Sequence, residues 1–241
     1  MTDNRRYKRI TRSQIKLVAF TSMLIDHFVR CFVFDTQTGQ LVHLSIGRVA
    51  YPLFLWLFFF GFFYSKSHKK QLLLLTASAL LSEWQFDYML YGSHTENYMR
   101  HQNIMFTWIM GLIMLCILEQ ISRRIRNEYA AVITEAVIIC LFAFIGSSAR
   151  VDYGHVTFLI LGSMYMIRQI LFREDMSTIV QIFLGSLCVL SVAVFTSRPG
   201  VLLALPFVLL YSGSKGKYSM KYLYYAGYPL HLLIFAAIKC I

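Results

Sequence analysis

The chain has 241 residues, of which 57% are hydrophobic and only 15% are charged, whereas a soluble domain carries roughly 25% charged residues. This composition excludes an ordinary soluble globular protein and indicates a polytopic membrane protein. The net charge of +11 does not indicate a nucleic-acid partner, because the basic residues alternate with apolar runs and do not line one soluble face.

Nine apolar segments of helical length follow one another along the chain, and a membrane-spanning helix needs about 20 mostly apolar residues. The segments fall at residues 15–34, 46–64, 71–91, 103–121, 129–148, 155–172, 177–196, 199–213 and 221–239. The sequence therefore predicts an all-α fold, a polytopic integral membrane protein of about nine transmembrane helices joined by short loops. Residues 1–14 would form a basic cytoplasmic tail and residues 15–241 a single transmembrane domain. The first apolar run lacks the small-residue cleavage site of a secretory signal, so we expect it to remain as the first helix.

Lysine and arginine predict the orientation, since they are enriched in cytoplasmic loops. An N-terminus inside would place seventeen of them on the cytoplasmic side, namely Arg5, Arg6, Lys8, Arg9, Arg12, Lys16, Lys66, Lys69, Lys70, Arg123, Arg124, Arg126, Arg168, Arg173, Lys215, Lys217 and Lys221. The other side would keep six, namely Arg30, Arg48, Arg100, Arg150, Arg198 and Lys239. The prediction is an inside N-terminus and an outside C-terminus, with residues 199–213 as a short eighth span.

Polar residues within apolar runs are candidates for a functional site, because an ionisable group at membrane depth costs several kcal/mol unless it is paired or faces water. The candidates are Asp26 and His27 in the first segment, Arg48 in the second, Glu83 and Asp87 in the third, Asn103 and Thr107 in the fourth, Asp152 before the sixth, and Tyr228 and His231 in the ninth. Apart from His231, the ionisable ones lie toward the non-cytoplasmic ends. Pro229 removes a backbone hydrogen bond beside His231 and would open a polar recess there.

His27 carries the most specific chemistry. A neutral imidazole near a carboxylate can remove a proton from an incoming hydroxyl or amine, so we interpret His27 as a general base. A covalent acetyl-histidine is the alternative mechanism, and a packing role for His27 would make His231 the next candidate. Four other histidines, His43, His68, His94 and His101, lie in predicted loops and are expected to be solvated.

Glu83 and Asp87 are four residues apart and so share one helix face. We expect Arg48 or Arg150 to neutralise them, in a structural role or in orienting an acceptor. No HExxH or DxDxDG pattern accompanies them, so no metal is predicted.

Six motifs in order resemble the TraX family. They are Met23-Leu24-Ile25-Asp26-His27, Gly47-Arg48-Val49-Ala50-Tyr51-Pro52-Leu53-Phe54, Ser82-Glu83 with Phe86-Asp87, Asn103-Ile104-Met105-Phe106-Thr107, Asp152-Tyr153-Gly154, and Lys221-Tyr222-Leu223-Tyr224-Tyr225 running to Tyr228-Pro229-Leu230-His231-Leu232. The family is named for a conjugative-plasmid protein that acetylates the N-terminus of pilin, and it is similar to membrane acyltransferases that modify surface sugars.

The resemblance implies a bacterial cytoplasmic-membrane acyltransferase. Its donor would be cytoplasmic acetyl-CoA, and its acceptor a peptide, a pilin-like N-terminus or a surface carbohydrate presented in or across the bilayer. His27 and Arg48 would belong to its site. Two other functions also fit buried Asp, His and Arg residues: a proton-coupled transporter of small solutes, or a non-catalytic component of a membrane assembly.

Overall fold

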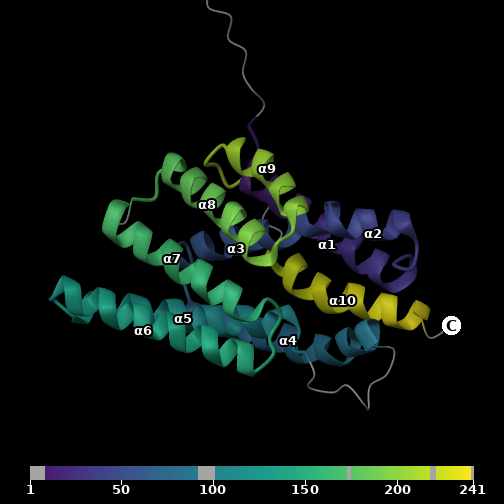
Figure 1. The fold of residues 1–241 in the computed structure, drawn as a ribbon, viewed down its shortest axis with the longest axis horizontal. Helices are drawn as coiled ribbons and strands as arrows, with labels where there is room; N and C mark the ends of the chain where they lie inside the picture. Colours follow the sequence, from purple (N-terminus) through teal and green to yellow (C-terminus); the bar gives the residue numbers. More distant parts are fainter. Residues whose placement is uncertain (1–8, 92–100, 173–174, 218–220, 240–241) are drawn as a thin grey trace, which may run out of the picture.

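A computed structural model describes residues 9–91, 101–172, 175–217 and 221–239. Within these residues the chain is helical, and its only β contacts are two isolated bridges, Ile10 with Tyr211 and Gln102 with Val151 (Figure 1). The elements are α1 (Arg12–Phe32), α2 (Gln37–Leu44), η1 (Ile46–Val49), α3 (Ala50–Phe63), α4 (His68–Tyr91), α5 (Ile104–Arg124), α6 (Glu128–Ser148), α7 (Gly154–Phe172), α8 (Thr178–Thr196), η2 (Pro199–Ala204), α9 (Leu205–Leu209) and α10 (Lys221–Lys239).

Polar caps explain where several helices begin. The Thr11 side chain and the Gln14 side chain form a reciprocal capping box at the start of α1, and Asn103, Asn127 and Ser177 accept backbone N–H groups at the starts of α5, α6 and α8. Each cap satisfies a backbone donor that has no partner inside its helix. These caps place the helix starts within a few residues of the sequence-based boundaries.

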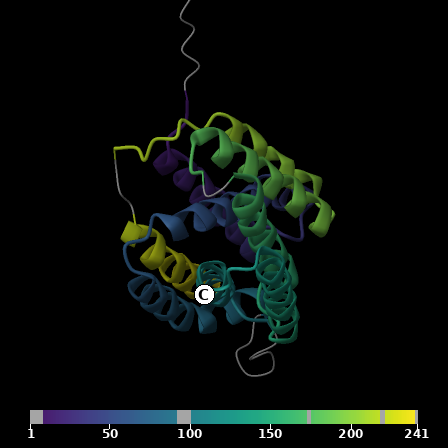
Figure 2. The same ribbon diagram turned by 90° about the vertical axis from the view of Figure 1, so that its left-hand side faces the viewer.

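Helix contacts define two ends of the bundle. At the N-terminal end, Arg12 of α1 donates to the Tyr211 hydroxyl at 3.0 Å and lies over the ring of Tyr64, which follows α3. At the opposite end, the loop before α5 pairs with the loop before α7 through Gln102 and Val151. The long helices run between these ends. Viewed from its left-hand side, the molecule has α10 and α4 (yellow and blue) on one side and α6 and α7 (teal to green) on the other (Figure 2).

The second predicted segment was expected to begin at residue 46, whereas the apolar helical stretch in the structure begins at Gln37. The apolar stretch is Gln37–Phe63, 27 residues long, and it consists of α2, η1 and α3 with a break around Ser45. The break lies beside the midpoint of α1, where Ser22 Oγ donates to the carbonyl of Ile46 at 2.6 Å. Non-helical backbone is tolerated at membrane depth only where protein buries it or a cavity borders it. The break therefore marks the place where Arg48 enters the interior of the bundle.

The eighth predicted segment, residues 199–213, is not one α-helix. It consists of the 3-10 helix η2 followed by the five-residue helix α9. It begins beside the Leu44 carbonyl, against which Gly200 packs, and it ends at the N-terminal end, where the Ile10 N–H donates to the Leu210 carbonyl at 2.7 Å. A 3-10 helix rises about 2.0 Å per residue against about 1.5 Å in an α-helix, so the short segment covers much of the length of its neighbour α8.

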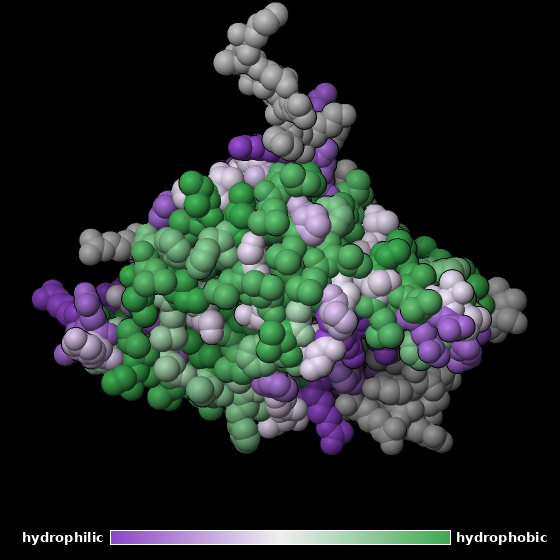
Figure 3. All heavy atoms as spheres, turned by 45° about the horizontal axis from the view of Figure 1, so that its top comes forward, coloured by the Kyte–Doolittle hydropathy of each residue, from purple (hydrophilic) through white to green (hydrophobic). Residues whose placement is uncertain are grey.

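The outer surface is strongly apolar. Ile179, Val194 and Phe144 are 80%, 76% and 71% exposed, and apolar residues cover most of one face, with hydrophilic residues near its edges (Figure 3). In the described residues, five segments are long and apolar enough to cross a membrane: Gln37–Phe63, Ile104–Arg124, Glu128–Ser148, Gly154–Phe172 and Thr178–Thr196. An exposed apolar surface of this extent fits contact with lipid. The prediction of a helical membrane protein agrees with these five segments, which do not by themselves establish nine spans.

Candidate active site

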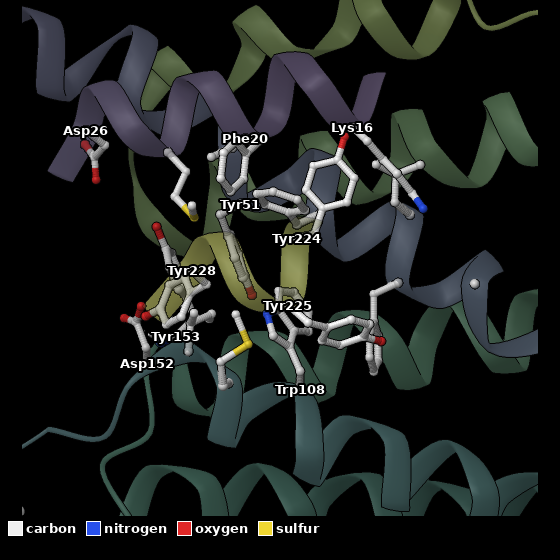
Figure 4. A pocket seen from close by; sticks show the side chains of 18 of the residues that line it. Lys16, Phe20, Asp26, Tyr51, Trp108, Asp152, Tyr153, Tyr224, Tyr225 and Tyr228 are labelled. Atoms are coloured by element: carbon white, nitrogen blue, oxygen red, sulfur yellow. Dashed lines mark hydrogen bonds between the residues drawn. The ribbon is translucent and has the colours of Figure 1, made fainter. Parts of the chain in front are cut away.

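A cavity of about 1000 Å³ runs through the bundle between its two ends. Arg12, Lys16 and Lys215 line it at the N-terminal end, and Asp152 and Arg198 line it at the opposite end. Figure 4 shows Asp26 and Asp152 on one side, Lys16 on the other, and aromatic rings between them. The middle is lined by Phe20, Met23, Phe54, Leu57, Phe58 and Trp108. We call the end lined by Arg12, Lys16 and Lys215 the N-terminal mouth of the cavity, and the end lined by Asp26, His27 and Asp152 the polar chamber. The apolar side chains lie between them.

His27 of α1 and His231 of α10 form a hydrogen-bonded pair of imidazoles. The distance between His27 Nδ1 and His231 Nε2 is 2.6 Å, and their ring planes differ by only 16°. His231 is 6% exposed, whereas the His27 ring lines the cavity. The pair joins two helices far apart in sequence, and His27 is the member that a substrate can reach.

The surrounding contacts determine which nitrogens of this pair carry protons. His231 Nδ1 lies 2.9 Å from the Gly227 carbonyl, which can only accept, so this nitrogen carries the proton. In the neutral ring, His231 Nε2 is then an acceptor, and His27 Nδ1 must donate to it. His27 Nε2 consequently has a lone pair and no proton. This is the form that a general base needs.

Pro229 in α10 leaves one backbone carbonyl without its helical donor. Pro229 has no N–H, so the carbonyl of Tyr225, four residues earlier, has no helical donor. Ser78 Oγ of α4 donates to that carbonyl at 3.1 Å instead. The exchange fixes α10 against α4 close to the histidine pair.

A second chain of polar groups links Asp26, His43 and Arg48. His43 Nδ1 donates to Asp26 Oδ1 at 2.7 Å, and the Arg48 guanidinium donates to the other ring nitrogen of His43. Arg48 Nε also donates to the His43 carbonyl at 3.1 Å. A neutral imidazole therefore bridges a carboxylate and a guanidinium. Since both of its nitrogens are engaged, His43 is a less available base than His27.

The expectation that His43 is solvated is wrong: it is 8% exposed and belongs to this chain. The cause is the break in the second segment, since α2 folds back along α1 and carries His43 to Asp26. His68 stacks on Phe62 and bonds its carbonyl, His101 lines the cavity, and His94 lies outside the described residues.

The acids of α4 lie beside the start of α5. Glu83 Oε2 accepts the Asn103 backbone N–H at 3.1 Å and its side-chain N–H at 2.5 Å. Asp87 is 1% exposed. The hydrogen bonds of Arg48 go to His43 and Tyr153, so its expected pairing with Glu83 and Asp87 is not observed. Asn103 caps α5 and ties it to α4, which is an architectural role.

Asp152 forms the floor of the polar chamber together with residues from neighbouring elements. Its backbone carbonyl accepts the Thr107 hydroxyl at 2.7 Å, and its carboxylate lies 3.9 Å from His101 Nε2. Loss of water raises the pKa of the Asp152 carboxyl above its usual range, and nearby His101 opposes this. Burial likewise raises the pKa of Tyr153 to about 12, and its ring stacks on Tyr51 with centroids 3.5 Å apart.

Comparison of the sequence with known proteins shows the family of this chain. Residues 11–239 match the family described as TraX protein. The chain belongs to the TraX family. One similar protein, the probable fimbrial assembly protein FimC, serogroup H1, of Dichelobacter nodosus, is 24% identical over 246 residues, which cover 94% of each chain. No solved structure matches.

The TraX motifs converge on the cavity from separate parts of the chain. Five of the expected site residues line it: Asp26, His27, Arg48, Asp152 and Tyr228. His231 lies directly behind His27. Glu83, Asp87, Asn103 and Thr107 are absent from the lining. Glu83 and Asn103 join α4 to the start of α5, and Thr107 joins α5 to the loop before α7. Among the described residues, no group of three or more His, Cys, Asp or Glu side chains could hold a metal.

Sequence reasoning missed three residues of the chamber. Tyr51 and Tyr153 occur within the TraX motifs and form its stacked wall, and His43 holds Asp26. The motifs contained the two tyrosines, whereas nothing in the hydropathy pattern indicates that the chain folds back at Ser45.

Proposed function

We propose that the protein is a membrane-embedded acyltransferase that moves an acetyl group from acetyl-CoA to an acceptor in or across the membrane. The observation that carries the proposal is the cavity that leads from one end of the bundle to His27, whose Nε2 is held unprotonated by His231. Membership of the TraX family supports the same chemistry.

In this reaction His27 Nε2 accepts the proton of the acceptor hydroxyl or amine as that atom attacks the thioester carbonyl. The carbon–sulfur bond breaks, and the coenzyme A thiolate takes up a proton. His231 accepts the hydrogen bond from His27 Nδ1 and so keeps the ring oriented while it becomes charged. Arg48, which lines the same cavity, places positive charge where the carbonyl oxygen becomes negative.

The proposed topology has nine crossings, with the N-terminus inside and the C-terminus outside. Support comes from the helix directions. α1 and α10 run parallel, since Lys16 lies over Tyr224 and His27 meets His231, as the first and ninth crossings must. α8 runs antiparallel to α3, with Gln181 beside Tyr64 and Cys188 beside Pro52. With this orientation, acetyl-CoA enters at the N-terminal end and the acceptor at the opposite end.

The fimbrial assembly relative favours an acceptor among surface or pilus proteins. An N-terminal amine of a pilin-like peptide fits a chamber that contains the carboxylates of Asp26 and Asp152, because a carboxylate attracts an ammonium group before its deprotonation. A carbohydrate hydroxyl is the other acceptor class.

The lining argues against a proton-coupled transporter of small polar solutes. Between the two polar ends, the lining includes Phe20, Phe54, Leu57, Phe58 and Trp108, which offer a polar solute few hydrogen-bond partners in exchange for its water. A slender acyl-bearing arm held at one end can occupy such a passage without itself crossing the membrane.

The test is to incubate the purified protein with acetyl-CoA and measure free coenzyme A, with and without acceptor peptides. We expect slow hydrolysis alone and faster release with an acceptor. His27→Ala should lower transfer by about 100- to 10,000-fold, the usual contribution of a general base. His155→Ala is the matched control, since His155 is exposed outside the cavity. A folded protein that releases no coenzyme A under either condition would refute the proposal.

A further inference from the structure

We propose that the N-terminal mouth of the cavity is a phosphate-binding site that holds the nucleotide end of the acyl donor. This inference rests on the proposed function and adds a location and residues to it. Four cations form the site, Arg12 and Lys16 of α1 and Lys215 and Lys217 of the loop before α10, and all four line the cavity.

Backbone hydrogen bonds hold the two halves of this mouth together. The N–H groups of Arg12 and Ser13 donate to the carbonyls of Ser214 and Lys215 at 2.9 and 3.1 Å, and Ser13 Oγ donates to the Lys215 carbonyl at 2.7 Å. Gly216 has a φ of +84° and packs so closely on Thr11 and Ser13 that a Cβ would collide with them. The loop is thereby fixed on the start of α1, which brings its lysines to the cavity.

The described charged side chains that line this mouth are all positive. Arg12 bonds neutral groups, the Gln181 amide oxygen and the Tyr211 hydroxyl, so those contacts leave its charge intact. Within the described lining, the carboxylates are those of Asp26 and Asp152, which both lie toward the other end. Cations that converge on one opening of a cavity attract multiply charged anions.

Membrane orientation alone does not account for this arrangement. Positive-inside topology requires only that basic residues lie on one side, and Arg124 and Arg126 satisfy it without lining the cavity. It gives no reason for four cations to converge on one opening. Convergence on an opening is what binding of a phosphate-bearing ligand requires.

The mouth also suits a nucleotide better than an isolated lipid phosphate. The rings of Tyr64 and Tyr224 line it, and Arg12 and Lys16 lie 4.5 and 5.7 Å from those ring centroids. Aromatic rings beside cations offer both a stacking surface for a base and partners for phosphates. From Lys16 to His27 is eleven residues of α1, about 16 Å along its axis, a span suited to the pantetheine arm of coenzyme A.

The experiment measures binding of coenzyme A and of pantetheine to the full chain in phosphatidylcholine nanodiscs, separately from turnover. Lys215→Gln with Lys217→Gln should raise the dissociation constant for coenzyme A about tenfold at low salt and leave that for pantetheine unchanged. Both lysines are exposed, so folding should be preserved. Arg124→Gln with Arg126→Gln removes the same charge from the same end outside the cavity and should have no effect.

The possible results separate this inference from the proposed function. If coenzyme A binds in a way that depends on the two lysines but no acetyl group is transferred, the phosphate-binding site is supported and the proposed acyltransferase activity is refuted. If acetyl transfer occurs and the double lysine substitution leaves the Michaelis constant for acetyl-CoA unaltered, the phosphate-binding site is refuted. It would also be refuted if the parent protein binds no coenzyme A, or if the lysines affect only association with phosphatidylglycerol added to the nanodiscs.

Discussion

In the proposed mechanism, His27 of α1 acts as the base and His231 of α10 holds its ring in place. His27 faces the cavity, and His231, fixed by the Gly227 carbonyl, accepts from its other nitrogen. A serine-protease triad uses a carboxylate in the corresponding place. A neutral imidazole orients the base without adding a buried negative charge, which suits a site among apolar helices.

This arrangement predicts that activity requires a hydrogen-bond acceptor for His27 Nδ1, and that the acceptor need not belong to an imidazole. His231→Ala should lower the turnover number about 10- to 100-fold, a part of what a general base contributes, with the Michaelis constant for acetyl-CoA unchanged. His231→Gln should recover much of the loss, because its amide oxygen can accept from His27 Nδ1. Equal loss in both folded variants would contradict a positioning role.

Asp26 is expected to matter for stability through its link to His43 and Arg48. Asp26→Asn would leave the guanidinium, which is 5% exposed, without its carboxylate, and breaking a buried ionic link costs about 3 to 5 kcal/mol. We expect a lower unfolding temperature in detergent and a lower folded yield. Asp35→Asn, at an exposed position after α1, is the control, and an unfolding temperature equal to that of the parent for both variants would argue against the link.

At the scale of elements, the break between α2 and α3 brings the site together. It lets Arg48 turn inward and places Gly47 directly against the Asp26 carboxylate, where an added Cβ would collide. A discontinuous helix at membrane depth exposes backbone polar groups, and proteins keep such segments where a cavity uses them.

Two glycines, Gly47 in η1 and Gly61 in α3, give a matched pair of substitutions. Gly47→Ala should destabilise the fold and displace Asp26, because the new methyl group overlaps its carboxylate. Gly61→Ala in α3, where nothing lies within 4 Å of the added atom, should be neutral or stabilising by up to about 1 kcal/mol. Thermal unfolding of both variants measures the difference, and equal midpoints would contradict the close approach.

Hydropathy was sufficient for the regular helices but not for the interrupted ones. α5 to α8 lie within a few residues of their predicted ranges because each is a long apolar run. Polar N-caps mark the starts of α5, α6 and α8. Residues 46–49 are mostly apolar too, so nothing local indicates the 3-10 turn there. That turn is held by a tertiary bond, from Ser22 to Ile46, and contacts of this kind are not encoded in periodicity.

In the candidate site, too, some residues could be predicted from the sequence and others could not. The motifs identified His27, Arg48 and Asp152, which line the cavity. They could not indicate that Asp26 would bind His43, because His43 belongs to a segment that was expected to be a loop.

At the scale of the whole molecule, helix directions and charge distribution lead to the same arrangement. The loop at Gly213 packs against Thr178 at the start of α8, and residues 210–212 pair with Ile10. The chain therefore returns to the N-terminal end between α8 and α10. In the proposed topology, this return makes α10 the ninth crossing and would place the two polar mouths of the cavity on opposite faces of the membrane.

Reporter fusions at Lys70, Gly213 and the C-terminus test this arrangement directly. Lys70 and Gly213 should report a cytoplasmic location and the C-terminus an external one, because seventeen of the basic residues belong to the ends that this orientation places inside. A periplasmically active enzyme and a cytoplasmically active one, fused at each site, give opposite signals and control for expression. An external Gly213 would mean that residues 199–213 do not cross, and a cytoplasmic C-terminus would reverse α10. Either result would separate the donor mouth from the cytoplasm and so remove the physical basis for acetyl-CoA entering there.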